Sequence, residues 1–176
     1  IRTLDLRGRT LTKAEINREI PRARLDVETA MAVIAPILER VKNGSEETLR
    51  ELAQEFDGVK PAQIRVPQTA LDQALAELDP AIRTALELSI SRIRKVHEDQ
   101  VRSVKTVQVV DGGTVTEKWI PVDRVGLYVP GGRAVYPSSV MMNVVPAQIA
   151  KVSSIAVASP PQKEFSGLPH PTILAT

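Results

Sequence analysis

The chain has 176 residues, of which 43% are hydrophobic and only 3% aromatic, so aliphatic side chains must form the core of about one ordinary domain. The 23 basic and 21 acidic residues leave a net charge of +2, which does not favour a nucleic-acid partner. The absence of cysteine excludes disulfides, thiolate catalysis and cysteine-ligated zinc, and no apolar run is long enough for a membrane span. We therefore expect a soluble, cytoplasmic protein.

The first half of the chain has the apolar spacing of amphipathic helices. Thr12 followed by Glu15 is a capping-box pattern, which predicts the start of the first helix. Asp26 suits the cap of the second helix, Pro36 should kink or interrupt it, and Pro80 suits the first turn of the last helix. The predicted helices occupy residues 12–21, 26–43, 45–58, 68–79 and 80–101, and residues 62–67 are a candidate short strand.

The hydrophobic pattern changes from about Ser103, where apolar and polar residues begin to alternate. The turn sequence Asp111-Gly112-Gly113 stands in the middle of this alternating stretch. Two alternating runs joined by such a turn predict a β-hairpin near residues 104–122.

The next stretch predicts a strand, a loop, a helix and a second strand, which together form one right-handed βαβ unit. We expect the strand that begins at Arg124 to be buried, and the helix to bend near Val145 because a proline follows it. Two parallel strands and one helix cannot cover both faces of a parallel sheet. The fold class is therefore α/β and truncated, with a helix-rich part and a hairpin over 1–123 and an incomplete parallel-sheet unit over 124–176.

The loop Pro130-Gly131-Gly132 is a candidate ligand site, because open α/β sheets bind ligands at the carboxyl ends of their strands. It lacks the G-x-G-x-x-G spacing of dinucleotide-binding loops and the lysine of a Walker loop. The alternative is a tight turn with one residue at positive φ. Tyr128 could contact a ribose or stack on a base, or its ring could be buried.

Other polar residues are weaker candidates for contacts with a ligand or a metal. Tyr136 shares the ambiguity of Tyr128, whereas Ser138 and Ser139 could bind a phosphate or cap the following helix. His97 and His170 are better explained as a helix-surface residue and a loop residue than as metal ligands. We therefore predict no metal ligand and no catalytic residue within this chain.

A long motif covers residues 124–161, RVGLYVPGGRAVYPSSVMMNVVPAQIAKVSSIAVASPP. It resembles the histidinol dehydrogenase family, in which G-x-Y-V-P-G-G-x-A-x-Y-P-S-S-V-x-M-N-x-x-P-A recurs. The upstream segments EFDGV and RIRKVHEDQ are also similar to that family, so the resemblance extends over essentially the whole chain.

The resemblance implies a zinc-dependent oxidoreductase of histidine biosynthesis, which oxidises L-histidinol through L-histidinaldehyde to L-histidine with two molecules of NAD. It also implies an intertwined homodimer with two Rossmann-like domains, so that residues 124–176 would be part of an NAD-binding unit. In the family the tyrosine of LYVPGG contacts NAD, and that role carries over to Tyr128. Pro130 and Gly131 are further candidates for NAD binding on the same loop.

The resemblance also implies which parts are missing. The family's zinc ligands (a glutamine, two histidines and an aspartate), its Glu-His catalytic pair and most of its substrate contacts are expected beyond Thr176. The chain is therefore interpreted as an amino-terminal fragment that is inactive alone. Two alternatives are a non-catalytic module that forms oligomers and a nucleotide-binding domain unrelated to histidine synthesis.

Overall fold

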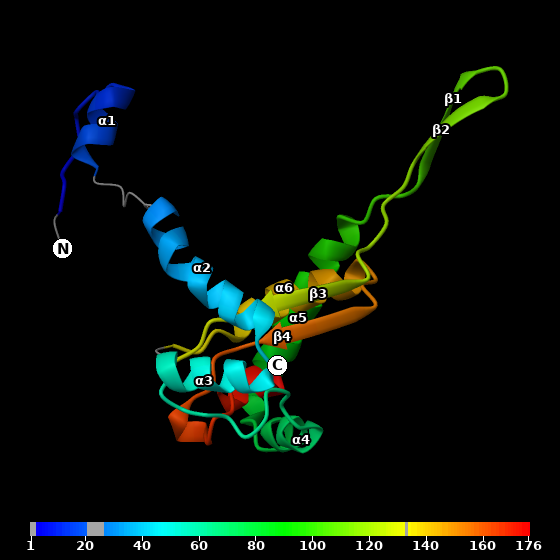
Figure 1. The fold of residues 1–176 in the computed structure, drawn as a ribbon. Helices are drawn as coiled ribbons and strands as arrows, with labels where there is room; N and C mark the ends of the chain where they lie inside the picture. The colour runs from blue at the N-terminus through cyan, green and yellow to red at the C-terminus, as the bar shows by residue number, and fades with distance from the viewer. Residues whose placement is uncertain (1–2, 21–26, 133) are drawn as a thin grey trace. The chain divides into compact units, whose positions relative to one another are not determined.

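The computed structural model describes residues 3–20, 27–132 and 134–176 (Figure 1). The chain divides into two units, Ile1–Asn43 and Gly44–Thr176. Helices predominate, and the strands form a small antiparallel sheet and a small parallel sheet, which confirms the predicted α/β class. The boundary expected between a helix-rich part over 1–123 and a parallel-sheet unit over 124–176 stays a prediction. Among the helices of the described residues, none has the length and apolar character needed to cross a membrane.

The first unit contains α1 (Lys13–Glu19) and α2 (Val27–Asn43). The predicted capping box is present, because the Thr12 N–H donates to the Glu15 carboxylate at 2.8 Å and the Glu15 N–H donates to the Thr12 hydroxyl at 3.3 Å. Asp26, the expected cap of α2, lies outside the described residues. Pro36 does not interrupt α2, which continues through it at the cost of one backbone hydrogen bond.

The helices of the second unit pack in pairs, with α5 against α6 and α4 against α7. Asp79 caps α5 by accepting hydrogen bonds from the Ala81 and Ile82 N–H groups at 2.7 and 3.2 Å. Arg94 on α5 donates to the Gln148 side chain on α6 at 3.0 Å. The helices are α3 (Glu46–Phe56), α4 (Gln68–Ala76), α5 (Pro80–Asp99), α6 (Pro137–Ile149), the short 3-10 helix η1 (Lys163–Phe165) and α7 (Pro171–Ala175).

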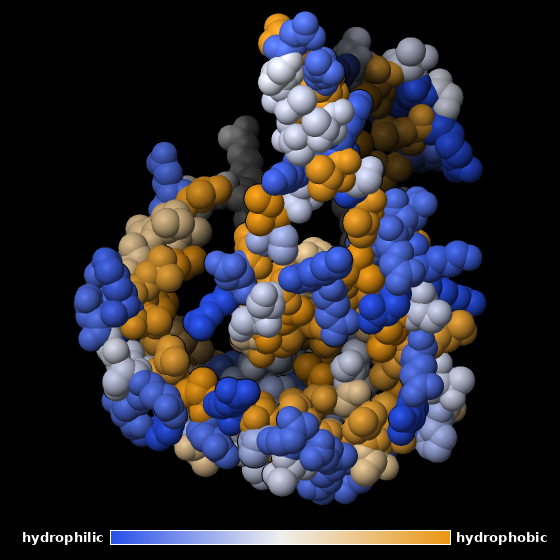
Figure 2. Space-filling model, turned by 90° about the vertical axis from the view of Figure 1, so that its right-hand side faces the viewer, coloured by the Kyte–Doolittle hydropathy of each residue, from blue (hydrophilic) through white to orange (hydrophobic). Residues whose placement is uncertain are grey.

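The predicted hairpin is formed by β1 (Lys105–Val110) and β2 (Gly113–Glu117), which pair antiparallel. Val107 and Val115 pair on one face of this hairpin. The Thr106 and Thr116 hydroxyls, 2.9 Å apart, pair on the other face. The strand residues are almost all exposed, and Figure 1 draws the hairpin as an arm beside which no labelled helix or strand lies. Apolar side chains also reach the surface among charged ones in the face that Figure 2 shows.

The predicted βαβ unit consists of β3 (Arg124–Tyr128), α6 and β4 (Ser154–Ala158), with the two strands parallel (Figure 1). Its core is formed by the fully buried Val129 together with Val140 and Ile173. The expectation that β3 is buried is wrong, since its residues alternate between exposed and half-buried. A two-stranded sheet covered by one helix leaves its second face open.

The strand expected at residues 62–67 is also wrong, because this segment is an irregular loop between α3 and α4. A strand needs a neighbour with which to share backbone hydrogen bonds, and proline lacks the donor at both Pro61 and Pro67. The loop packs instead against the carboxyl-terminal segment, where a methyl group at Gly167 would lie 3.2 Å from the Pro61 Cα.

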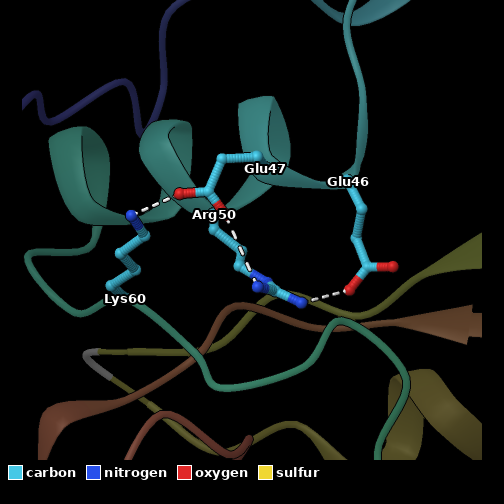
Figure 3. Close-up of polar contacts among 4 residues, drawn as sticks. All are labelled: Glu46, Glu47, Arg50 and Lys60. Carbon is cyan, nitrogen blue, oxygen red and sulfur yellow. Dashed lines mark hydrogen bonds and ion pairs between the residues drawn. The ribbon is translucent and has the colours of Figure 1, made fainter.

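A cluster of charged side chains on α3 links this helix to the loop that follows it (Figure 3). Arg50 pairs with Glu46 at 2.5 Å and with Glu47 at 3.4 Å, and Lys60 from the loop pairs with the other oxygen of Glu47 at 2.5 Å. The Lys60 hydrogen bond is the main cause that holds the pKa of Glu47 below its ordinary value of 4.5, and the charge of Arg50 lowers it further. The pair therefore favours the ionised carboxylate in the folded chain.

Since the pKa of Glu47 is lower in the folded chain, this cluster contributes stability above pH 4.5 and loses it as the pH falls through the folded value. We expect Glu47→Gln to lower the free energy of unfolding slightly at neutral pH, and the deficit relative to the wild type to shrink in acid. Urea unfolding over a pH series measures this. Glu51→Gln on the same helix is the control, because Glu51 has no ion pair with any described residue. A deficit independent of pH would contradict the assignment.

Candidate functional site

The carboxyl ends of β3 and β4 bring two loops together, residues 129–136 and 159–162. Tyr128 pairs with Ala158 at the last position of the parallel register. The Val129 N–H then donates to the Ala158 carbonyl at 2.8 Å, which extends the pairing by one residue. Because the Val129 side chain is fully buried, the Pro-Gly-Gly turn begins from a fixed point at the edge of the sheet where α/β folds bind ligands.

The two glycines of the turn have different roles. Gly132 adopts a φ of +95°, so the tight-turn alternative holds for this residue. Gly131 instead allows a close approach of the two loops. A methyl group there would lie 3.3 Å from the Pro160 Cδ, 3.3 Å from the Ser159 Oγ and 3.4 Å from the Gln162 Nε2. The ligand alternative for the loop stays a prediction, since the close neighbours of Gly131 are protein atoms.

Tyr128 is exposed, with 65% of its surface accessible, so the alternative that its ring is buried is wrong. It belongs to the open face of the parallel sheet, because side chains alternate along a strand and the other set is the half-buried one. Its neighbours on this face are small, namely Gly126, Ala156 and Ala158. A planar group could therefore lie against the phenol ring without displacing another side chain.

The structure gives less support for a ligand contact by the other candidates near the first loop. Tyr136 is the residue before α6, and its side chain makes no capping hydrogen bond. Ser138 and Ser139 lie inside the first turn of α6, so the helix-cap alternative is wrong for both. The Ser139 carbonyl accepts from the Asn143 side chain at 2.7 Å, which is an interaction within the helix.

The sequence pattern did not single out Ser159 and Gln162 in the second loop. The Ser159 Oγ is buried from solvent and has no hydrogen-bond partner among the described residues. It lies beside Gly131, as does the Gln162 side-chain amide. The rule that drew attention to the loop after β3 applies equally to the loop after β4, and it could have identified both residues.

Both histidines are engaged at helix ends. His97 lies 2.8 Å from the Gln100 side-chain oxygen through its Nδ1 at the end of α5. His170 accepts from the Thr172 N–H at 3.1 Å at the start of α7, and its ring meets Phe165 edge to face at 4.9 Å. Among the described residues, no group of three or more His, Asp or Glu side chains could hold a metal ion. These residues therefore do not fit a zinc site.

A depression of about 450 Å³ lies away from both loops, between the end of α5, the base of the hairpin and the end of α6. Arg102 stacks over the Trp119 ring there, 5.0 Å from its centre. Lys151, in a left-handed conformation with φ of 62°, forms another part of its wall. The depression contains no residue of the Pro-Gly-Gly turn, so it is separate from the candidate ligand site.

Comparison with known proteins gives the family. Residues 20–176 match the family model described as histidinol dehydrogenase. The chain belongs to the histidinol dehydrogenase family. The resemblance stated from residues 124–161 is thereby confirmed.

Several histidinol dehydrogenases are similar over nearly the whole chain. The enzyme of Thermobifida fusca is 61% identical over 99% of the chain, and that of Nocardia farcinica is 58% identical over 98% of it. A crystal structure of histidinol dehydrogenase from Elizabethkingia anophelis matches 89% of the chain and 35% of its own, with a TM-score of 0.78 and 27% identity. The chain spans about 39% of the length of the two curated relatives.

The close approach at Gly131 can be tested by adding one methyl group. We expect Gly131→Ala to lower the free energy of unfolding by about 1 kcal/mol, because the rigid Pro160 ring and the buried Ser159 hydroxyl must both move. Gly126→Ala in β3 is the matched control, since a methyl group there would meet nothing within 4 Å. Urea unfolding of both variants measures the difference. Equal stability of the two would show that the loops are not in close contact.

Proposed function

We propose that this chain forms part of the NAD-binding site of an enzyme that oxidises L-histidinol through L-histidinaldehyde to L-histidine, with two molecules of NAD. The single observation that carries the proposal is the position of one motif. Tyr128–Gly132 lies at the carboxyl ends of two parallel strands, in a chain that belongs to the histidinol dehydrogenase family. Such an edge is where open α/β sheets bind nucleotides. The proposal assigns residues 124–176 to an incomplete Rossmann-like unit.

The residues around the turn are compatible with a dinucleotide. One NAD would accept the hydride of the alcohol, and a second NAD would accept the hydride of the aldehyde after addition of water. Tyr128 offers an exposed ring beside a face of small side chains, and Pro130 and Gly131 form the adjoining wall. The close approach at Gly131 holds the loop after β4 against the turn. These residues bind and orient the cofactor in this proposal, and they transfer no proton.

The metal and the proton-transferring groups are a separate part of the proposal. The described residues do not fit a zinc site, so they hold no metal in this proposal. We propose that the zinc ligands, the catalytic pair and most contacts to L-histidinol come from parts of the enzyme that residues 1–176 do not include. The coverage of about 39% of the curated relatives supports this. A cytoplasmic homodimer belongs to the same proposal.

One observation favours a second candidate function, a non-catalytic module that forms oligomers. The apolar side chains of Val107, Val109 and Val115 on the hairpin are exposed, and a two-stranded hairpin alone is marginally stable in water. This module would have no reason to bind a dinucleotide through Tyr128. Binding of NAD to the chain therefore separates the two functions.

The role of Tyr128 can be tested by equilibrium binding of NAD to the chain. We expect Tyr128→Ala to weaken binding roughly tenfold, since loss of a ring that stacks on a base costs about 1–3 kcal/mol. Tyr128→Phe keeps the ring and should retain most of the affinity if stacking is the main contact. Phe56→Ala is the control, because Phe56 is an aromatic residue of similar exposure at the end of α3. Unchanged affinity in Tyr128→Ala would remove the proposed role.

The proposal that residues 1–176 contribute no zinc ligand and no catalytic base can be tested with the purified 176-residue chain. Supplied with L-histidinol, NAD and zinc, it should form no NADH, because oxidation of an alcohol needs a base and this chain is proposed to contribute none. Absorbance of NADH measures the reaction, and a full-length histidinol dehydrogenase under the same conditions is the positive control. Appreciable NADH formation by the chain alone would refute this part of the proposal.

A further inference from the structure

The depression at the base of the hairpin lies at the opposite end of the parallel sheet from the candidate ligand site. The end of α5 leads into the hairpin, and the hairpin returns through residues 119–121 into β3 (Figure 1). These segments and the end of α6, which precedes β4, form the walls, so the depression lies at the amino ends of both strands. Arg94 on α5 donates to the Gln148 side chain on α6 at 3.0 Å, which holds two walls together. The volume of about 450 Å³ is typical of a site for a small molecule.

The walls of the depression carry positive charge. Arg102 and Lys151 both line it, and none of the described residues that line it has a carboxylate. Neither of the two cations has an ion pair with a described residue. Arg102 instead stacks over the ring of Trp119, 5.0 Å from its centre, so the N–H groups at the edge of its guanidinium are available to donate. The depression therefore combines two unpaired cations with an exposed aromatic ring.

Lys151 adopts a backbone conformation that is unfavourable for lysine. α6 ends in a Schellman motif, in which the Val152 N–H donates to the Ala147 carbonyl at 3.1 Å and the Lys151 N–H donates to the Gln148 carbonyl at 3.0 Å. The residue at this position has a positive φ, here 62°, and is usually glycine because a β-carbon is strained there. No hydrogen bond or ion pair of the Lys151 side chain with a described residue offsets the strain. Strained residues of this kind cluster at functional sites.

We propose that the depression binds a small carboxylate with a planar, apolar body, such as an aromatic acid. Arg102 and Lys151 donate to the carboxylate, because a flat guanidinium and an ammonium both form charge-assisted hydrogen bonds with it. The planar body packs against Trp119 and Ile149, since most residues that line the depression are apolar. The strained lysine thereby has a use that glycine could not serve.

The same walls exclude other classes of ligand. An amino acid or an amino alcohol carries an ammonium group, which would meet Arg102 and Lys151 and no acidic partner among the described lining residues. A phosphate with two charges would lose more hydration than a carboxylate against a mostly apolar lining. The ligand is therefore neither L-histidinol nor NAD, and this second site goes beyond the proposed function.

The one tryptophan of the chain makes the site directly observable. The Trp119 indole N–H gives a single NMR signal from within the depression, and it is followed while 2-naphthoate is added to the 176-residue chain. The neutral 2-naphthamide and acetate are matched ligands that lack the charge and the ring, respectively. We expect naphthoate to shift the signal and to bind about tenfold more tightly than either. Saturating NAD should leave the naphthoate affinity unchanged, because the proposed NAD site lies at the other end of the sheet.

Lys151→Gly separates a ligand-binding lysine from a structural one. Since glycine relieves the backbone strain, this variant should raise the thermal unfolding midpoint by a few degrees and yet bind naphthoate about tenfold less tightly. Arg102→Gln should also weaken naphthoate about tenfold, because a neutral amide replaces the charged fork. Arg92→Gln is the matched control, since Arg92 is an arginine of α5 that does not line the depression.

Four results would overturn the inference. They are no shift of the Trp119 signal in the wild type, equal affinity for naphthoate and naphthamide, undiminished naphthoate binding in both variants, and competition between naphthoate and NAD. Equal affinity for the two naphthalenes would show a hollow without preference for anions, and competition would place naphthoate at the edge that carries Tyr128. If naphthoate binds through Lys151 but NAD does not bind to the chain, the second site stands and the proposed NAD function fails.

Discussion

The parallel pairing of β3 with β4 is the interaction on which the candidate site depends. Its register sets Tyr128 opposite Ala158, and the Val129 N–H continues the pairing to the Ala158 carbonyl at 2.8 Å. This contact fixes the depth of Val129 in the core and therefore the start of both loops. A shift of one residue would turn the Tyr128 ring toward α6 and expose the Val129 side chain. The geometry of the turn is thus a consequence of strand register and core packing together.

Much of the fold could be predicted from the sequence because it depends on nearby residues. The capping box of Thr12 with Glu15, the hairpin turn and the βαβ order all rest on contacts within one or two elements. The strand expected at residues 62–67 was wrong for the opposite reason, since a strand exists only where a neighbour offers backbone hydrogen bonds. The burial expected for β3 was wrong because burial depends on which elements cover a sheet face, and apolar composition alone does not determine that.

Only part of the candidate site could be predicted from the sequence. The sequence singled out Tyr128 and the Pro-Gly-Gly turn, yet it offered a ligand approach and a tight turn as alternatives. In the structure Gly132 has the positive φ of a tight turn, whereas Gly131 meets the loop after β4, a contact that neither alternative included. Ser159 was missed because its position beside Gly131 follows from the register of two strands that α6 separates in sequence. No local motif carries that information.

In the proposed function, two molecules of NAD would occupy this edge of the sheet one after the other. The described side chains around the turn offer a ring, a hydroxyl and an amide, and none of them carries a charge. Neutral groups bind an anionic cofactor less tightly than charged ones, so a cofactor held by them exchanges faster. In that function, NADH formed in the first oxidation must leave before a second NAD can enter. Strong binding at this site would then slow the release of NADH. It would not speed hydride transfer, because interactions equally strong before and after that step do not lower its barrier. An exposed aromatic ring on an open sheet face meets that requirement.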